Sequence, residues 1–301
     1  MVKYIVNLLI ILLLTASTGI CAAEVAAPKH SISEKVLSIP DTNKSKAKKV
    51  KRESSFGKKK ITFENFDQSY DRAMRFYNNQ QYLSAAGIFE ELYPLSLGTP
   101  RADTILYLFA YCYYMNADYN MSALHFRDYV RRYPNSDKTE DAFYYCISAI
   151  YKTSPDYSLD QSNTEYAIEQ IKAFIQAYPH NAHIEECNEM LDGLRVKMAR
   201  KDLEILKLYY NTDHFEACQI AAKNFFNEYS YSPLMPEAVY YLVLNNYEYA
   251  KKSVEGKKIE RYKACLEACD RMERNYPDCK YFKETNRIAQ ETRKILEKKQ
   301  Q

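Results

Sequence analysis

The sequence predicts an all-α protein, a superhelical solenoid of about five helix pairs with a C-terminal closing helix. Three observations lead to this fold class. The 301 residues include only 6 Gly and 10 Pro, which is too few turn formers for a fold of many short strands. Apolar residues after position 63 recur at helical spacing. A motif that ends in Tyr-Pro or a close variant recurs in five copies.

The first 20 residues have the order of a secretory signal peptide. A lysine precedes the apolar run 4–14, and small, weakly polar residues follow it. The run is shorter than the about 20 apolar residues of a membrane-spanning helix. The sequence is compatible with two forms of processing. The chain is cut after Ala22 or Ala23, or Cys21 is lipidated as the new N-terminus, although Ile20 stands where lipoprotein signals usually have a smaller residue.

Residues 21–62 are expected to form a flexible basic tether. From residue 24 onward they contain no periodic apolar pattern and many Lys, Ser, Ala and Pro. Between Lys44 and Lys60 lie nine Lys or Arg and one acidic residue, a local charge of +8. This stretch is either a solvated linker or a contact for anionic lipid head groups, where each clustered lysine gains about 1 kcal/mol.

Residues 63–300 are expected to form the solenoid itself. The repeated motif is an aromatic residue, a small residue three places later, a bulky residue four places beyond that, and then the Tyr-Pro marker. A small residue lets two helices approach closely where they cross, and the bulky residue fills the adjoining groove. Proline then stops the second helix. The marker tyrosines are Tyr93, Tyr133, Tyr178, Tyr229 and Tyr276.

Two copies are longer than the others. Residues 152–163 lengthen the turn between the two helices of copy three, and residues 253–258 add length to copy five. The charged segment from about Phe282 to Lys299 is expected to form the closing helix, because a terminal repeat needs a solvated outer face.

These spacings resemble the tetratricopeptide repeat. In copy two its small, aromatic, small, aromatic and Pro positions are matched by Ala110, Tyr113, Ser122, Phe126 and Pro134. The segments 77–94 and 111–134 are further similar to the BamD family, the tetratricopeptide lipoproteins of the outer-membrane β-barrel assembly machine. The resemblance covers about residues 63–280. It implies a non-catalytic scaffold, lipid-anchored at the periplasmic face of the outer membrane.

The resemblance also implies partners. The N-terminal repeats would receive C-terminal segments of unfolded outer-membrane proteins, and the C-terminal repeats would contact the central barrel subunit alongside accessory lipoproteins. An alternative stays open, in which a periplasmic protein of the same fold, free of lipid, coordinates peptidoglycan or envelope assembly. Neither function calls for nucleic acid.

The candidate peptide-binding groove lies on the first helices of copies one and two. Its residues are spaced one helical turn apart, so they share a face on each helix. They are Tyr70, Met74, Tyr77, Tyr107, Tyr111 and Tyr114. Because aromatic side chains bind extended peptides, the two helices are expected to line one strip. In the alternative, these tyrosines only fill space between neighbouring repeats.

No catalytic site, metal site or cofactor is expected. The six glycines never fall at the spacing of a phosphate-binding loop. His183 with Cys187, and His214 with Cys218, form i, i+4 pairs that could each offer two metal ligands. However, Cys218 and Cys265 occupy the small position of the repeat, and cysteine often serves as a small buried apolar residue. We therefore expect these cysteines to pack at helix crossings.

Overall fold

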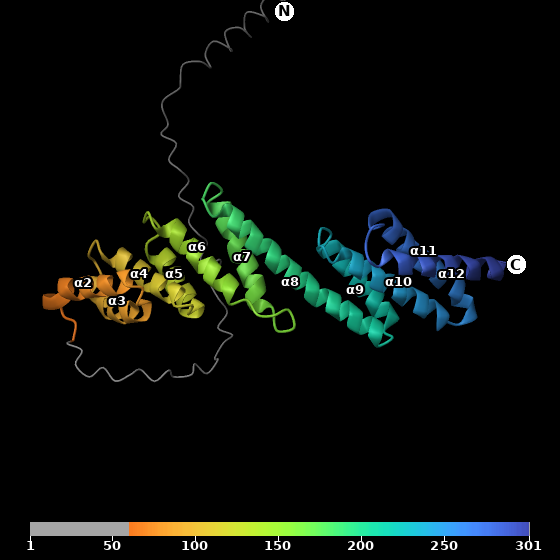
Figure 1. Cartoon of the computed structure of the whole chain (residues 1–301), viewed down its shortest axis with the longest axis horizontal. Coiled ribbons are helices and arrows are strands. Elements are labelled where there is room, and N and C mark those ends of the chain that lie inside the picture. Colours follow the sequence, from red (N-terminus) through yellow and green to blue (C-terminus); the bar gives the residue numbers. More distant parts are fainter. Residues whose placement is uncertain (1–59, 301) are drawn as a thin grey trace, which may run out of the picture. The chain divides into compact units, whose positions relative to one another are not determined.

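The computed structural model describes residues 60–300 of the chain. The expected signal peptide, Cys21 and nearly all of the expected tether lie outside the described residues. Within residues 60–300 all regular structure is helical (Figure 1). No helix in this part of the chain is long and apolar enough to cross a membrane.

Eleven α-helices follow one short 3-10 helix in residues 60–300, and each packs chiefly on its neighbours along the chain. The elements are η1 Phe63–Asn65, α2 Phe66–Asn78, α3 Tyr82–Ser96, α4 Ala102–Met115, α5 Tyr119–Arg132, α6 Thr139–Lys152, α7 Ser162–Ala177, α8 Ile184–Asn211, α9 Phe215–Glu228, α10 Met235–Lys251, α11 Glu255–Asn275 and α12 Phe282–Gln300. They form five consecutive pairs, from α2/α3 to α10/α11, and α12 closes the series. The predicted fold class is confirmed.

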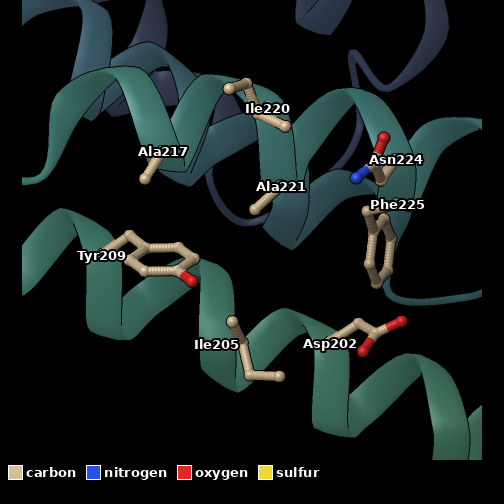
Figure 2. A pocket seen from close by; sticks show the side chains of 8 residues that line it. All are labelled: Asp202, Ile205, Tyr209, Ala217, Ile220, Ala221, Asn224 and Phe225. Atoms are coloured by element: carbon tan, nitrogen blue, oxygen red, sulfur yellow. The ribbon is translucent and has the colours of Figure 1, made fainter.

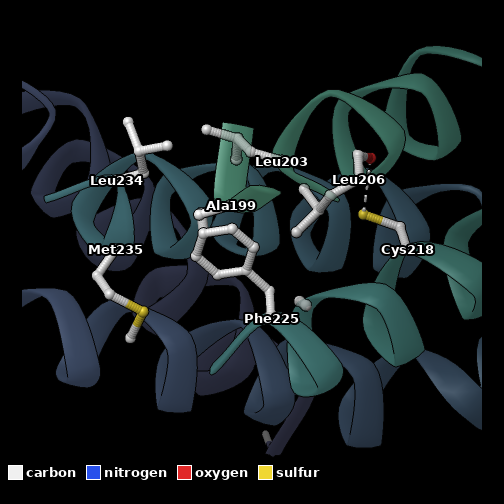
Figure 3. Close-up of a cluster of buried hydrophobic side chains, with 9 residues drawn as sticks. Ala199, Leu203, Leu206, Cys218, Phe225, Leu234 and Met235 are labelled. Atoms are coloured by element: carbon white, nitrogen blue, oxygen red, sulfur yellow. Dashed lines mark hydrogen bonds between the residues drawn. The ribbon is translucent and has the colours of Figure 1, made fainter. Parts of the chain in front are cut away.

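The small position of the repeat is fully buried in all five pairs. It is occupied by Ala85, Ser122, Ala167, Cys218 and Cys265. Figure 3 shows the fourth pair, where the Cys218 thiol donates to the Leu206 carbonyl of α8 at 3.6 Å, with Phe225 packed nearby. A residue without bulk at this point lets the two helix axes approach. Both cysteines lie at helix crossings, as expected.

The marker tyrosine ends the second helix in four of the five pairs. In these pairs it is the first residue after the helix, and its backbone N–H still bonds the carbonyl four residues earlier. In the first pair the expectation that proline stops the helix is wrong, because α3 continues through Pro94 to Ser96. Pro94 stands in the last turn, where it removes only one intrahelical bond. The Ser96 hydroxyl then donates to the Tyr93 carbonyl at 2.7 Å.

Helix α8 is shared between the third and fourth pairs. It has 28 residues, whereas the other first helices have 13 to 17. It contacts α7 on one side, and its second half, from Ala199 onward, forms a buried cluster with α9. A Cβ added to Gly193 would lie 3.4 Å from the Tyr151 hydroxyl of α6. The backbone of α8 therefore passes close to the Tyr151 side chain at this residue.

The added residues of the two longer copies have different structures. Residues 153–161 form the long turn between α6 and α7, as predicted. In copy five only residues 252–254 lie between α10 and α11, and residues 255–258 are already helical. The extra length of copy five therefore extends a helix.

Candidate peptide-binding surface

Helices α2, α4 and α6, the first helices of three consecutive pairs, bring their tyrosines together. Tyr77, Tyr111 and Tyr145 are spaced 34 residues apart in the sequence. The ring centroids of Tyr77 and Tyr111 are 6.2 Å apart, and those of Tyr111 and Tyr145 are 5.1 Å apart. Equivalent positions of successive repeats therefore meet ring to ring.

Two more tyrosines of α4 extend this contact along the helix. The centroid of Tyr111 lies 6.3 Å from that of Tyr107 and 6.3 Å from that of Tyr114, and the rings are stacked in both pairs. Tyr114 also contacts Tyr145, at 5.0 Å. We call Tyr77, Tyr107, Tyr111, Tyr114 and Tyr145 the aromatic face. All five side chains are half-buried, so each ring is held by its neighbours and still has surface open to a ligand.

The aromatic face is anchored in the core below it. The Tyr107 ring lies 5.5 Å from that of Phe126 and 5.7 Å from that of Tyr129, and both of these residues are fully buried. The hydroxyls of Tyr114 and Ser148 lie 2.8 Å apart and form a hydrogen bond between α4 and α6. Packing against buried residues fixes the orientation of the exposed ring edges.

Burial raises the pKa of three phenols of the aromatic face, those of Tyr77, Tyr107 and Tyr145. Burial, and then the neighbouring Tyr111, raise the pKa of Tyr77 to about 12. Burial likewise raises the pKa of Tyr107 and of Tyr145. These three side chains therefore present uncharged hydroxyl groups at neutral pH, because even the ordinary phenol pKa lies well above 7.

Two of the six predicted groove residues lie beside the aromatic face rather than in it. The Tyr70 ring packs against Phe89 of its own helix pair, at 6.4 Å, and the Arg101 guanidinium lies 5.4 Å from its centroid. Met74 is half-buried on α2, between Tyr70 and Tyr77 in sequence. The other four predicted residues belong to the ring network.

Residues of α6 and of the start of α8 that the sequence pattern did not predict continue the network. Tyr144 contacts Tyr145 at 5.3 Å, and its ring stacks on His183, with centroids 3.8 Å apart. The Tyr144 hydroxyl donates to the Glu186 carboxylate, and this bond holds the pKa of Glu186 below its usual value. The signal that could have found Tyr145 is the 34-residue interval that already joins Tyr77 to Tyr111.

The first helices of the fourth and fifth pairs carry ion pairs beside a smaller ring contact, between Tyr210 of α8 and Tyr241 of α10 at 5.7 Å. Lys207 of α8 bonds Glu237 of α10 at 2.5 Å and Glu204 at 2.9 Å. Arg200 lies 3.6 Å from both carboxylates. Burial alone would raise the pKa of Glu237, but Lys207 and Arg200 hold it below its usual value. We call Arg200, Glu204, Lys207 and Glu237 the charged network.

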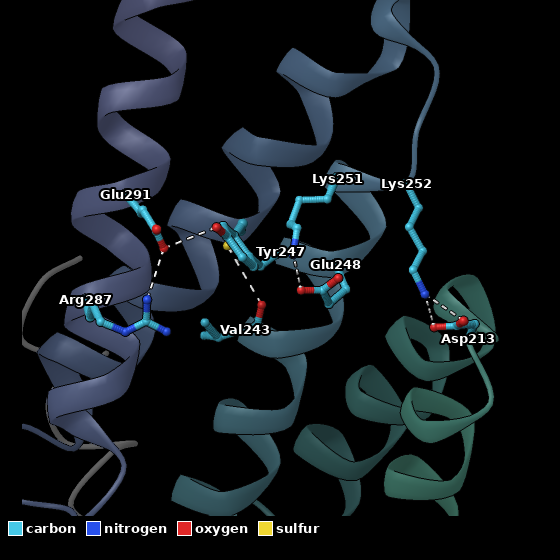
Figure 4. Close-up of polar contacts among 9 residues, drawn as sticks. Asp213, Val243, Tyr247, Glu248, Lys251, Lys252, Arg287 and Glu291 are labelled. Carbon is cyan, nitrogen blue, oxygen red and sulfur yellow. Dashed lines mark hydrogen bonds and ion pairs between the residues drawn. The ribbon is translucent and has the colours of Figure 1, made fainter.

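Polar contacts of the same kind continue toward the C-terminus. Figure 4 shows the Tyr247 hydroxyl of α10 donating to Glu291 of α12 at 3.2 Å. It also shows Lys252, which follows α10, paired with Asp213 of the turn before α9 at 2.6 Å. In this half of the described chain, polar side chains bind one another across neighbouring elements.

The two candidate metal pairs have other roles in the described residues. His183 stacks on Tyr144 and Cys187 is fully buried. The His214 ring lies 2.9 Å from the Thr212 hydroxyl, and Cys218 packs against α8. Among residues 60–300 no group of three or more His, Cys, Asp or Glu side chains could hold a metal ion.

A family profile described as YfiO, outer membrane lipoprotein, matches residues 64–218. The chain belongs to the YfiO family. This is the family of BamD, which confirms the resemblance seen in the sequence. A search of curated proteins found no match.

The YfiO match begins in η1 and ends within α9. It contains every residue of the aromatic face, whereas Glu237 of the charged network lies beyond it. It also contains four of the eight residues that line a groove of about 330 Å³ between α8 and α9 (Figure 2). Ile205 and Ile220 line this groove from opposite sides, and Ile220 is 61% exposed.

Proposed function

We propose that this YfiO-family chain is an outer-membrane protein assembly factor. It is a non-catalytic scaffold that receives unfolded β-barrel precursors and docks them on the central barrel subunit, alongside accessory lipoproteins. Membership of the YfiO family supports the assembly context. The observation that carries the receiving role is the aromatic face, with five half-buried tyrosines spread over three repeats.

The spacing of the rings fits an extended peptide with aromatic residues at alternate positions. Alternate side chains of an extended chain recur about every 6.6 Å. The ring centroids along α4 recur every 6.3 Å, so successive client aromatics meet successive tyrosines. An aromatic pair contributes about 0.5 to 1.5 kcal/mol beyond area burial. Several such pairs give a complex that forms readily and still releases its client.

The aromatic face can be tested with the double substitution Tyr111→Ser and Tyr114→Ser. We expect it to weaken binding of a client C-terminal peptide about tenfold or more, because about two aromatic pairs are lost. Tyr231→Ser, at a fully exposed tyrosine outside the face, is the matched control. Circular dichroism checks that helical content is unchanged. If the folded double variant keeps the affinity of the wild type, the tyrosines are packing residues and clients bind elsewhere.

We further propose that Cys21 carries lipid and holds the chain at the periplasmic face of the outer membrane. The basic tether of residues 21–62 then lets the solenoid of residues 63–300 stand off the membrane surface. Two acyl chains anchor a protein stably where a single chain is marginal. Membership of an outer membrane lipoprotein family supports this proposal.

The anchor is tested by mass spectrometry of the mature N-terminus and by the Cys21→Ala variant. We expect acylated Cys21 in the wild type and release of the variant into the soluble periplasmic fraction. A mature chain that begins after Ala22 or Ala23 without lipid would favour the periplasmic alternative, a coordinator of peptidoglycan or envelope assembly. Retention of the variant at the membrane would point to the basic segment 44–60 or to partner subunits as the anchor.

A further inference from the structure

The aromatic face lies between two opposite charges of α6. Asp141 stands in the first turn of this helix, and Lys152 is its last residue. Both side chains are exposed. Among the described residues, neither side chain forms an ion pair or a hydrogen bond, and Lys152 makes only a contact with an aromatic ring. Both charges are therefore available to a ligand.

Asp141 marks one end of the aromatic face. It precedes Tyr145 by one helical turn, so the two side chains share a side of α6. Its carboxylate acts on Tyr107 and Tyr145. It further raises the pKa of Tyr107, after burial and Tyr145, and that of Tyr145, after burial and Tyr111. The nearest lysine in sequence, Lys138, directs its ammonium to the Thr104 hydroxyl at 3.4 Å.

Lys152 marks the other end. Its ammonium lies 5.5 Å from the centroid of the Tyr119 ring. That ring in turn lies 5.6 Å from the ring of Tyr114, a residue of the aromatic face. Between the two charges, α6 presents Tyr145 and Ser148, which contact the tyrosines of α4.

The distance between the two charged positions sets the length of the segment that could span them. Eleven residues of α-helix rise about 16 Å. An extended peptide covers that distance with about five residues. To pair with both residues, such a peptide would need a negative charge beside Lys152 and a positive charge beside Asp141.

We propose that the aromatic face binds C-terminal segments in one direction, with the terminal carboxylate on Lys152 and a basic side chain about five residues earlier on Asp141. The inference rests on the proposed function of the same face. A lysine ammonium offers three donors to a carboxylate. An internal strand of the same composition has a neutral peptide group at this point and gains nothing from Lys152. The face therefore distinguishes the end of a client chain from its interior.

The test uses the purified mature protein and three eight-residue peptides with alternating aromatic residues. The first has a free carboxylate and a lysine five residues from its end. The second is its C-terminal amide, and in the third the lysine is replaced by glutamine. Affinities are measured at low salt for the wild type, Lys152→Gln and Asp141→Asn. Lys172→Gln, an exposed lysine on α7, is the control.

We expect each changed peptide to bind the wild type roughly two- to fivefold more weakly, as for loss of one exposed ion pair. Lys152→Gln should bind the acid and the amide equally and should still distinguish lysine from glutamine. Asp141→Asn should bind the lysine and glutamine peptides equally and should still distinguish the acid from the amide. If the wild type binds the acid and the amide equally, the proposed direction of binding is wrong. The same holds if Lys152→Gln keeps the full preference for the acid. Either result would leave the proposed function standing. Failure of every peptide to bind would overturn the proposed function as well.

Discussion

In α2, α4 and α6, Tyr77, Tyr111 and Tyr145 meet ring to ring across the repeats. In α8 and α10 the rings of Tyr210 and Tyr241 also meet, at 5.7 Å. Here, however, Lys207 forms an ion pair with Glu237, and the two side chains are only 16% and 18% exposed. Both regions use the first helices of the same repeat, and both rest on the same crossing of a small residue with its partner helix. The two regions differ in whether their surface groups already have partners within the protein.

Each tyrosine of the aromatic face keeps part of its apolar surface open to solvent, and that surface gains free energy when a ligand covers it. The charges of the charged network are already paired with one another, so a ligand would have to compete with existing partners. The first three repeats are therefore suited to transient capture, and the last two to a fixed geometry.

The largest effect is expected in the charged network. Lys207→Met should lower the free energy of unfolding by about 3 kcal/mol, because it leaves the largely buried Glu237 carboxylate without its closest cation. Urea denaturation measures the loss. Peptide binding by the aromatic face should be unchanged.

The paired variant Lys207→Met with Glu237→Met is the control for this prediction. It should recover most of the lost stability, since replacing both members of a buried pair by apolar residues is often neutral. If Lys207→Met instead keeps its stability and loses peptide binding, the division between the two regions is wrong.

The second prediction concerns the core that both regions share. Ala110 of α4 and Cys218 of α9 are both fully buried at crossings. Substitution of either by leucine should cost about 1 to 3 kcal/mol, because extra methylenes overfill a close crossing. Cys218→Ala should cost less than Cys218→Leu. Chemical denaturation of the three variants checks the ranking. If leucine destabilises the protein at only one of the two sites, the two regions do not share one kind of core.

A smaller effect is expected at alkaline pH. The pKa of Tyr77 rises from 10.0 to about 12 in the folded protein, through burial and then through Tyr111. The unfolded chain therefore loses this proton first, and the stabilising contribution is present below about pH 10 and is lost as pH rises toward 12. Tyr77→Phe should flatten that loss in denaturation curves recorded between pH 9 and 12, and the exposed Tyr231→Phe is the control. An unchanged slope would show that the Tyr77 hydroxyl is as well hydrated in the folded protein as in the unfolded chain.

The sequence predicted the five pairs and the closing helix because small side chains at fixed spacing, such as Ala85 and Cys265, are required wherever two helices cross closely. It did not predict the length of α8. Nothing between residues 184 and 211 stops a helix, since the segment has no proline and its one glycine is accommodated at a helix contact. A helix shared by two pairs follows from packing on both sides, which periodicity along one chain does not reveal.

Only part of the aromatic face was predicted, again because a sequence pattern reveals local relations and not packing between repeats. Helical spacing placed Tyr107, Tyr111 and Tyr114 on one face of α4, because that relation is local. Whether a third helix joins depends on how the repeats stack. The intervals between Tyr-Pro markers, 40 and then 45 residues for the first three copies, hid the regular interval of 34 residues that leads to Tyr145. Those longer intervals arise in the turns and second helices, whereas the aromatic face depends on the first helices alone.

We expect clients to bind the aromatic face and not the equivalent region of the last two pairs. Photo-crosslinking in the full-length protein tests it most directly, with a photoreactive phenylalanine analogue at Tyr114 of α4 or at Tyr241 of α10. Tyr241 is a matched position, because it is also half-buried on a first helix and lies 5.3 Å from the Lys207 ammonium of the charged network. With an unfolded barrel precursor, we predict crosslinks from position 114 to the last residues of the precursor and none from position 241. Crosslinks from position 241 alone, or equally from both positions, would contradict the account.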